Sequence, residues 1–125
     1  MEKEIQNVLA YFAIGMMIIL PMAIYGFILI DKLIKQMYYS HNEEWVKVGK
    51  PSGMFYYPPE ARSLQSMISM QLNIFVWVFK TPKWIKGDET SSSYLKKLRF
   101  ILAIANLAML GLFTLIAITI IGVIK

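Results

Sequence analysis

The chain has 125 residues, a formal net charge of +5, a hydrophobic content of 57% and no cysteine. The lack of cysteine excludes a disulfide framework, a thiolate nucleophile and a cysteine-based zinc or iron–sulfur site. With a single histidine, a metal site would consist almost entirely of carboxylates, so we expect no metal and no other cofactor. A basic charge would suggest nucleic acid in a soluble protein, but beside apolar segments it points to an anionic membrane surface.

Two long apolar runs, Val8 to Ile30 and Phe100 to Ile124, contain no Asp, Glu, Lys, Arg or His. As helices they would be about 35 and 37 Å long, enough to cross a hydrocarbon core about 30 Å thick. The fold class that we predict is an all-α membrane protein, an antiparallel two-helix transmembrane hairpin with a helical, partly interfacial cytoplasmic segment. The remaining chain is too short for a conventional soluble enzyme domain.

The predicted parts are an external tail over 1–7, transmembrane helices over 8–30 and 100–124, and a cytoplasmic segment over 31–99. The first run is longer than a signal-peptide core and its leader, Met1 to Glu4, is not basic, so we expect it to remain as a span. Pro21 lies near its centre and should bend the helix or, alternatively, act as a hinge.

Orientation follows from the distribution of Lys and Arg. Eleven of the thirteen lie between the two runs, and only Lys3 and Lys125 lie outside them. Because positive residues near a span favour the inner side, both termini should be outside and the middle segment should be cytoplasmic.

The middle segment reads as a series of short helices. Ser40 followed by Glu43 fits a capping box, and Gly49 with Pro51 fits a helix stop, which together predict a helix from about His41 to Val48. Residues 60–80 show both helical and alternating apolar spacing, so an interfacial amphipathic helix, a strand and a re-entrant span are all considered, and the helix is favoured. Asp88 or a following serine should cap a long helix that continues into the second span.

Basic and aromatic residues of the middle segment form the candidate contact surface for anionic lipid or a partner protein, because each Lys near the inner leaflet contributes about 1 kcal/mol. Stacking on nucleic acid would use the same residue types, but beside two spans no nucleic acid is expected. The residues are Trp45, Lys50, Trp77, Lys80, Lys83, Trp84 and Lys86.

Small residues recur at helical spacing in both spans and predict close helix packing, within the hairpin or in a homodimer, unless they reflect only the ordinary glycine content of membrane helices. The residues are Gly15, Ala23, Gly26, Ala108, Gly111 and Gly122. Tyr25 and Asn106 lie at similar depth, so we predict a hydrogen bond between them, or else that each points separately towards the interface.

No ionisable group lies inside either run, which argues against an autonomous pump or a charge-lined pore. His41 and Glu44 are one helical turn apart and could form a metal or acid–base pair, but His41 is more simply a polar residue at a helix start. No catalytic residues are therefore assigned, and the protein is predicted not to be an enzyme.

Two segments carry a family resemblance, Ser40 to Ser52 with its Trp45-Val46-Lys47-Val48-Gly49-Lys50-Pro51-Ser52 stretch and the charged approach from Asp88 to Arg99. Together with the order of parts, they resemble the universal stress protein B family of small two-span bacterial inner-membrane proteins. The resemblance implies a bacterial inner-membrane location and a stress-associated role without an established chemistry. The aromatic connector Phe55 to Tyr57 and the many lysines depart from that family.

Three functions are therefore weighed. The first is a small non-enzymatic membrane protein whose inner face contacts anionic lipid or a partner protein. The second is a homo-oligomeric channel or transporter component, and the third is an interfacial enzyme acting on lipid with His41 as its candidate.

Overall fold

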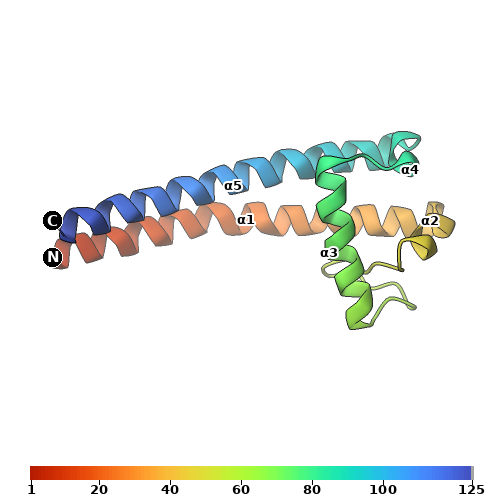
Figure 1. Ribbon diagram of the computed structural model, residues 1–125, viewed down its shortest axis with the longest axis horizontal. Coiled ribbons are helices and arrows are strands. Elements are labelled where there is room, and N and C mark those ends of the chain that lie inside the picture. The colour runs from red at the N-terminus through yellow and green to blue at the C-terminus, as the bar shows by residue number, and fades with distance from the viewer. Residues whose placement is uncertain (125) are drawn as a thin grey trace. The chain divides into compact units, whose positions relative to one another are not determined.

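The computed structural model describes residues 1–124, and Lys125, assigned above to the outer tail, lies outside the described residues. Within this range the chain is helical and contains no strand. Figure 1 shows the five helices in chain order, which are α1 (Glu2–Ser40), α2 (Asn42–Lys47), α3 (Leu64–Phe79), α4 (Lys83–Lys86) and α5 (Glu89–Ile124).

Two of these helices are long and apolar enough to cross a membrane, as predicted. They are α1, which has 39 residues and continues through Pro21 without interruption, and α5, which has 36. Only 6% of the most apolar 18-residue window of α5 is buried in the protein. The core helix of a soluble protein would be mostly covered, which α5 is not.

The described chain divides into two compact units, and the first combines Met1–Ile24 of α1 with the part of α5 that begins at Ile101. In this unit Gly15 lies directly beneath the side chain of Leu112, and Ile19 and Leu112 are buried. Most other large apolar side chains of the unit are exposed, as on a lipid-facing helix.

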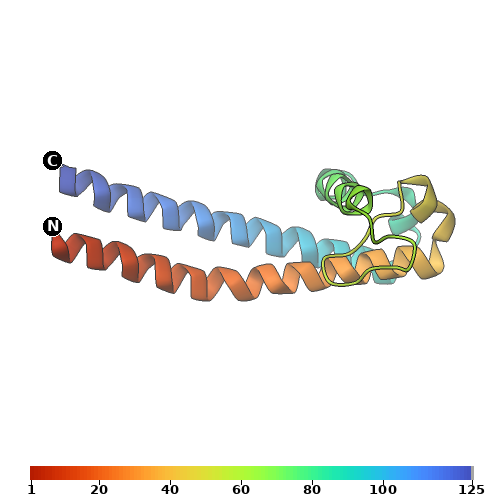
Figure 2. The same cartoon turned by 90° about the horizontal axis from the view of Figure 1, so that it is seen from below.

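The second unit, Tyr25–Phe100, holds the principal core. Side chains from α1 and α5 recur at three- and four-residue spacing, so that they share one face of each helix. The core residues include Leu29, Leu33, Ile34, Met37, Trp45, Trp77, Ile85, Leu95 and Leu98. Helix α3 runs across the Tyr25–Ser40 part of α1 in Figure 1 and is seen almost end-on in the turned view of Figure 2.

The ambiguous stretch 60–80 is therefore helical over most of its length, which confirms the helix and excludes the strand. Ser63 caps it with extended backbone angles and a side chain that accepts a hydrogen bond from the Ser66 backbone N–H at 3.2 Å. The helix ends at Phe79, shortly before Pro82. A strand would have lacked a pairing partner in a unit whose other elements are helices.

The helix expected from His41 to Val48 is present as α2, and it stops where Gly49 adopts a φ of +98°, a conformation that favours glycine. The capping box predicted from Ser40 and Glu43 is wrong. The N-cap residue is His41, and its side chain makes no capping hydrogen bond, because the imidazole is engaged elsewhere.

Candidate functional site

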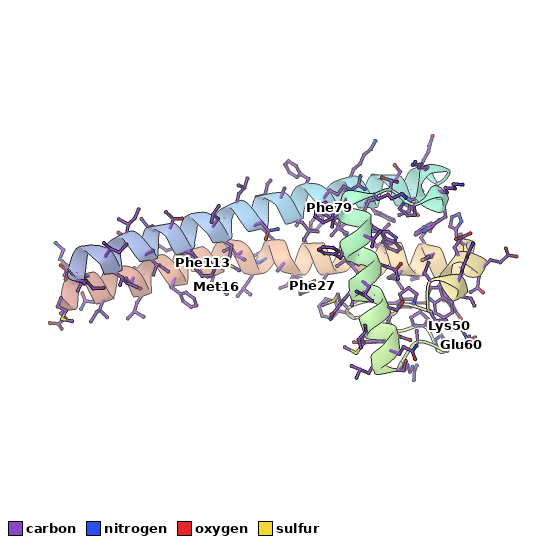
Figure 3. All side chains as sticks on the ribbon, in the orientation of Figure 1. Met16, Phe27, Lys50, Glu60, Phe79 and Phe113 are labelled. Atoms are coloured by element: carbon purple, nitrogen blue, oxygen red, sulfur yellow. The ribbon has the colours of Figure 1, made fainter. Side chains whose placement is uncertain are left out.

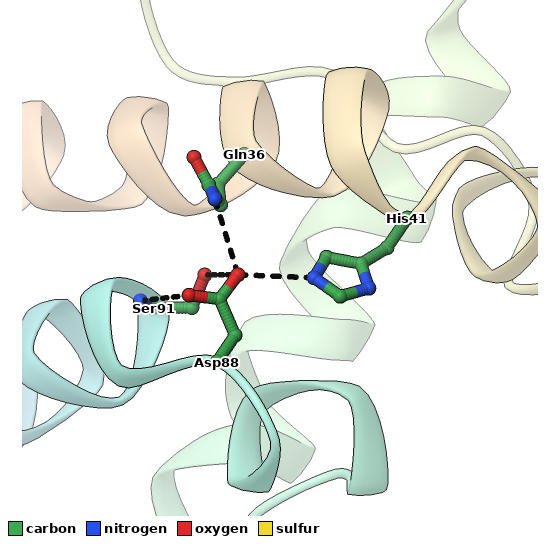
Figure 4. Close-up of polar contacts among 4 residues, drawn as sticks. All are labelled: Gln36, His41, Asp88 and Ser91. Atoms are coloured by element: carbon green, nitrogen blue, oxygen red, sulfur yellow. Dashed lines mark hydrogen bonds and ion pairs between the residues drawn. The ribbon is translucent and has the colours of Figure 1, made fainter.

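Asp88 is the polar centre of the second unit. Its carboxylate accepts hydrogen bonds from Gln36 Nε2 at 3.1 Å, from the Ser91 hydroxyl at 3.0 Å and from the Ser91 backbone N–H at 3.2 Å, and it pairs with His41 Nε2 at 3.0 Å. Figure 4 shows the carboxylate between Gln36 and His41, which come from the α1 side, and Ser91, which follows it in α5. The predicted role of Asp88 as the cap of α5 is confirmed, and the same side chain also joins α5 to α1.

The protonation of Asp88 reflects this environment. Burial acts to raise its pKa, but the hydrogen bonds from His41, Ser91 and Gln36 outweigh that effect and lower the pKa from 3.8 to about 2. An ionised carboxylate at the first turn of α5 also interacts favourably with the helix dipole. The group is therefore a permanent anion across the physiological pH range.

His41 has a second neighbour, because its ring lies 5.0 Å from that of Trp84. The partner proposed for it from sequence, Glu44, is exposed, whereas Asp88 lies 47 positions along the chain. His41 and Trp84 line a surface depression of about 580 Å³ together with Tyr39, Glu43 and Lys83, among others. Within residues 1–124, no three His, Asp or Glu side chains are grouped so that they could hold a metal ion.

Two charged side chains next to the apolar runs bind the backbone of the middle segment. Asp31, one residue after the first run, accepts hydrogen bonds from the backbone N–H groups of Met54 at 2.5 Å and Phe55 at 3.1 Å. Arg99, one residue before the second run, donates to the Trp77 carbonyl at 2.6 Å and to the Thr81 hydroxyl at 2.9 Å. Arg99 thus satisfies a carbonyl in the last turn of α3, where a cation is favoured.

The three tryptophans are largely buried in the second unit, so the predicted contact of Trp45 and Trp77 with lipid or a partner is wrong, whereas that of Trp84, which lines the depression beside His41, stays a prediction. Trp45 is fully buried, Trp77 is 3% exposed and Trp84 is 9% exposed. Trp45 donates its indole N–H to the Pro51 carbonyl at 2.9 Å, and the rings of Trp77 and Trp84 meet edge to face at 5.6 Å. Tryptophan beside lysine is typical of a membrane anchor, but here the large rings fill the core.

The predicted lysines behave differently from the tryptophans. Lys80, Lys83 and Lys86 are exposed, so their role in binding anionic lipid stays a prediction. Lys50 pairs with Glu60 at 3.3 Å (Figure 3). Its charge is therefore partly compensated within the protein.

The sequence analysis did not assign the residues on the outer face of α3 to the contact surface. Six apolar side chains of this face fall within about one third of the helix circumference, at three- and four-residue spacing, and the exposed amides of Gln65 and Gln71 lie among them and at their edge. The six apolar residues are Leu64, Ile68, Leu72, Phe75, Val76 and Phe79, with exposed fractions between 48% and 76%. The opposite face carries polar groups turned inward, since the Ser69 hydroxyl donates to the Val48 carbonyl at 2.7 Å. The predicted amphipathic helix is present with its apolar face turned away from the core, and its placement in a membrane interface stays a prediction.

The helix-packing residues divide into those that meet a neighbour and those that do not. A Cβ at Gly15 would lie 2.6 Å from a methyl group of Leu112, which agrees with close packing there. A Cβ at Gly111 or Gly122 would meet nothing within 4 Å in the described chain, so the structure gives no close hairpin contact at these two glycines, and a homodimer contact or the ordinary glycine content of apolar helices both stay predictions. Ala23 and Ala108 are half-buried and Gly26 is buried, with no packing partner assigned to them.

The predicted Tyr25–Asn106 hydrogen bond stays a prediction, because the two residues belong to different units. Asn106 Nδ2 donates to the Leu102 carbonyl of its own helix at 2.7 Å. This local bond already satisfies one of its polar atoms in an apolar stretch. Tyr25 is 41% exposed.

Comparison of the chain with protein-family models, with curated proteins and with solved structures finds no match.

Proposed function

We propose that the protein is a two-span integral membrane protein whose second unit lies at the inner membrane surface and binds anionic lipid there. The apolar parts of α1 and α5 form the antiparallel transmembrane hairpin, and the unit from Tyr25 to Phe100 is its cytoplasmic module. Support for the spans comes from their length and from the exposed apolar surface of both helices.

The observation that carries this proposal is the apolar outer face of α3. Full burial of a large apolar side chain is worth about 1.5–3 kcal/mol, so six such side chains exposed to water would forgo on the order of 5–10 kcal/mol. A helix with this surface gains that energy by lying in the plane of the interface, with its apolar face among the lipid chains. With 16 residues α3 is too short to cross the membrane.

The hydrogen bonds of Arg99 and Asp31 support a position of α3 near the boundary of the hydrocarbon core. Arg99 binds the last turn of α3 and Asp31 binds the connector before it, and each of these charges is the first one beyond an apolar run. A charge at that position marks the boundary of the hydrocarbon core. The backbone attached to it consequently lies near the headgroups.

The orientation and location follow from charge. The excess of lysine in the second unit favours the inner side of the membrane, with both termini outside. A bacterial inner membrane and a stress-associated role are what the resemblance to the universal stress protein B family implies, and they belong to the proposal on that basis. Binding of the membrane surface requires no enzymatic step, and the partners are membrane lipids.

The proposal is tested with single cysteines, because the chain has none of its own. Leu72→Cys on the outer face of α3 and Lys47→Cys on α2 are labelled with an environment-sensitive fluorophore in protein reconstituted into nanodiscs. We expect blue-shifted emission and quenching by brominated lipid for Leu72→Cys, and neither for Lys47→Cys.

Equal, water-like emission from both positions would refute the interfacial placement of α3. A partner protein on this face would give a different pattern, in which the cysteine at position 72 is protected from reagent in native membranes but exposed to water in nanodiscs. The orientation is tested separately with Ser52→Cys, which an impermeant maleimide should label only after the membrane is opened.

A second candidate, an interfacial enzyme that acts on lipid, is favoured by one observation. His41 is held by a carboxylate and lines a depression that contains further acids, an arrangement that general acid–base catalysis could use. His41→Gln should abolish lipid turnover by the reconstituted protein if this candidate is right. Unchanged turnover would exclude it.

A further inference from the structure

We infer that the second unit contains a specific site for the headgroup of an anionic phospholipid that carries two negative charges. The site is a surface depression of about 540 Å³ at the start of α5. The residues that line it are Lys86, Glu89, Ser92, Ser93, Lys96 and Lys97. This inference rests on the proposed placement of the unit at the membrane surface, and it names the lipid class.

The depression carries an excess of positive charge. Three ammonium groups and one carboxylate face the depression, which leaves two uncompensated positive charges. Among the described residues, Lys86, Lys96 and Lys97 take part in no ion pair. Like charges gathered at one place repel each other, and an anion of matching charge removes this repulsion.

The hydroxyl and ammonium groups that line the depression are arranged so that they can donate to one ligand. In α5, Ser92 and Lys96 are four residues apart, as are Ser93 and Lys97, so each hydroxyl lies one turn from an ammonium group on the same side of the helix. Lys86 approaches from the end of α4. Hydroxyl and ammonium groups are all hydrogen-bond donors, and a phosphate offers several acceptor oxygens to them.

The depth of these donors favours a lipid over free phosphate. Lys97 lies three residues before Phe100 and Ser93 lies seven residues before it, which places them about 4.5 and 10 Å along α5 from the apolar run. The headgroup layer on each side of the hydrocarbon core is about 5–8 Å thick. Lys96 and Lys97, at about 6 and 4.5 Å from the apolar run, thus lie in the layer that holds lipid phosphates, and Ser92, Ser93 and Lys86 lie on its water side.

A phosphate monoester headgroup, as in phosphatidic acid, fits the uncompensated charge better than a phosphodiester with a single charge. Each lysine near such a surface contributes about 1 kcal/mol, so loss of two lysines should weaken binding about 20- to 30-fold. Loss of the same charge elsewhere on the unit should have a much smaller effect, because exposed charges farther away are screened.

The test uses the full-length protein in nanodiscs of neutral lipid that contain a few per cent of phosphatidic acid or of phosphatidylglycerol. Native mass spectrometry measures the lipid retained by wild type, by Lys96→Gln/Lys97→Gln and by the control Lys47→Gln/Arg62→Gln. The control removes the same charge from exposed positions outside the depression. We expect a 20- to 30-fold loss for phosphatidic acid in the first variant only, and weaker, similar binding of phosphatidylglycerol by all three proteins.

Equal loss in both variants, or equal affinity for the two lipids, would overturn the specific site. Competition by inorganic phosphate at the same affinity would overturn its assignment to a lipid. The fluorophore at Leu72→Cys, measured in the same nanodiscs, separates this failure from failure of the proposed function. Lipid-like emission without specific retention rejects only the site, whereas water-like emission rejects the interfacial placement itself.

Discussion

Replacement of Asp88 by Asn tests whether this carboxylate holds the second unit together. Asn keeps the size of the side chain and can still cap α5 through its Oδ1. It removes the charge and presents an NH₂ group to Gln36 and His41, in place of the Oδ2 atom that accepts from three groups in the native protein. A hydrogen bond to a charged acceptor is worth about 1.5–3 kcal/mol. In the variant, the Gln36 amide and the Ser91 hydroxyl can rotate to accept from the new NH₂ group, which recovers part of the lost stability. We expect Asp88→Asn to lower the free energy of unfolding by about 2–3 kcal/mol at pH 7.

The destabilisation caused by Asp88→Asn should depend on pH in a defined direction. Because the pKa of Asp88 is lowered to about 2, the stabilisation that it provides is complete above its ordinary value of 3.8 and is lost as the pH falls towards 2. Asn has no proton to gain in this range. The difference in unfolding free energy between wild type and variant should therefore be constant above about pH 4 and shrink between pH 4 and pH 2.

Tryptophan fluorescence is a suitable assay, because all three tryptophans of the chain lie in the second unit. Urea unfolding in a mild detergent should show a transition whose midpoint is about 1–2 M lower in the variant at pH 7. A difference that stays constant from pH 7 to pH 2 would contradict the reasoning, since the charge would then not be the source of the stabilisation. The double variant His41→Gln/Asp88→Asn should lose much less unfolding free energy than the sum of the losses in the two single variants, because the two side chains contact each other.

Three glycine substitutions, one of them a control, test close contacts elsewhere in the protein. Gly53→Ala would bring a Cβ against the Asp31 carboxylate, so the connector that contains Gly53 would have to move away from Asp31. We expect this change to lower the urea midpoint of the second unit. An unchanged midpoint would mean that the contact can relax without loss of stability. A Cβ in Gly15→Ala would clash with the Leu112 side chain, whereas a Cβ in Gly111→Ala would meet no atom within 4 Å. We therefore expect only Gly15→Ala to weaken the packing of the two apolar segments, measured by titration with a denaturing detergent. Equal effects of these two would show that glycine flexibility rather than contact decides the result.

Much of the helical framework could be predicted from sequence, because its signals are local. A run of more than twenty residues without charge has few structural alternatives, and both apolar runs lie in continuous helices. The stop of α2 at Gly49 and the cap of α5 at Asp88 depend on residues within one turn. Only the stretch around α3 was ambiguous, because helical and alternating spacing coexist there until tertiary contacts decide between them.

The site could not be predicted in the same way, because it depends on which residues meet across the second unit. His41 and Asp88 are far apart in sequence, and the pattern around His41 pointed instead to the adjacent Glu44. The side chain of tryptophan is equally suited to a core and to an interface, so its neighbours in sequence do not decide between them. An amphipathic helix was predicted for this stretch, but the residues that its polar face would contact were not, and Ser69 and Asn73 donate to the Val48 carbonyl more than twenty residues earlier in the chain.

In the proposed interfacial placement of α3, the boundary charges Asp31 and Arg99 supply a cause outside the helix itself. An amphipathic helix of 16 residues on a flexible tether would partition between water and lipid according to its own composition. Here Arg99 holds the last turn of α3 and Asp31 holds the connector ahead of it, so that both ends of the segment are fixed to residues that cannot enter the hydrocarbon core. The depth of α3 is then set by where the two apolar runs end. On this proposal the entropic cost of ordering α3 is met when the protein folds, so the apolar face and the lysines at the start of α5 would contribute to membrane binding without that cost.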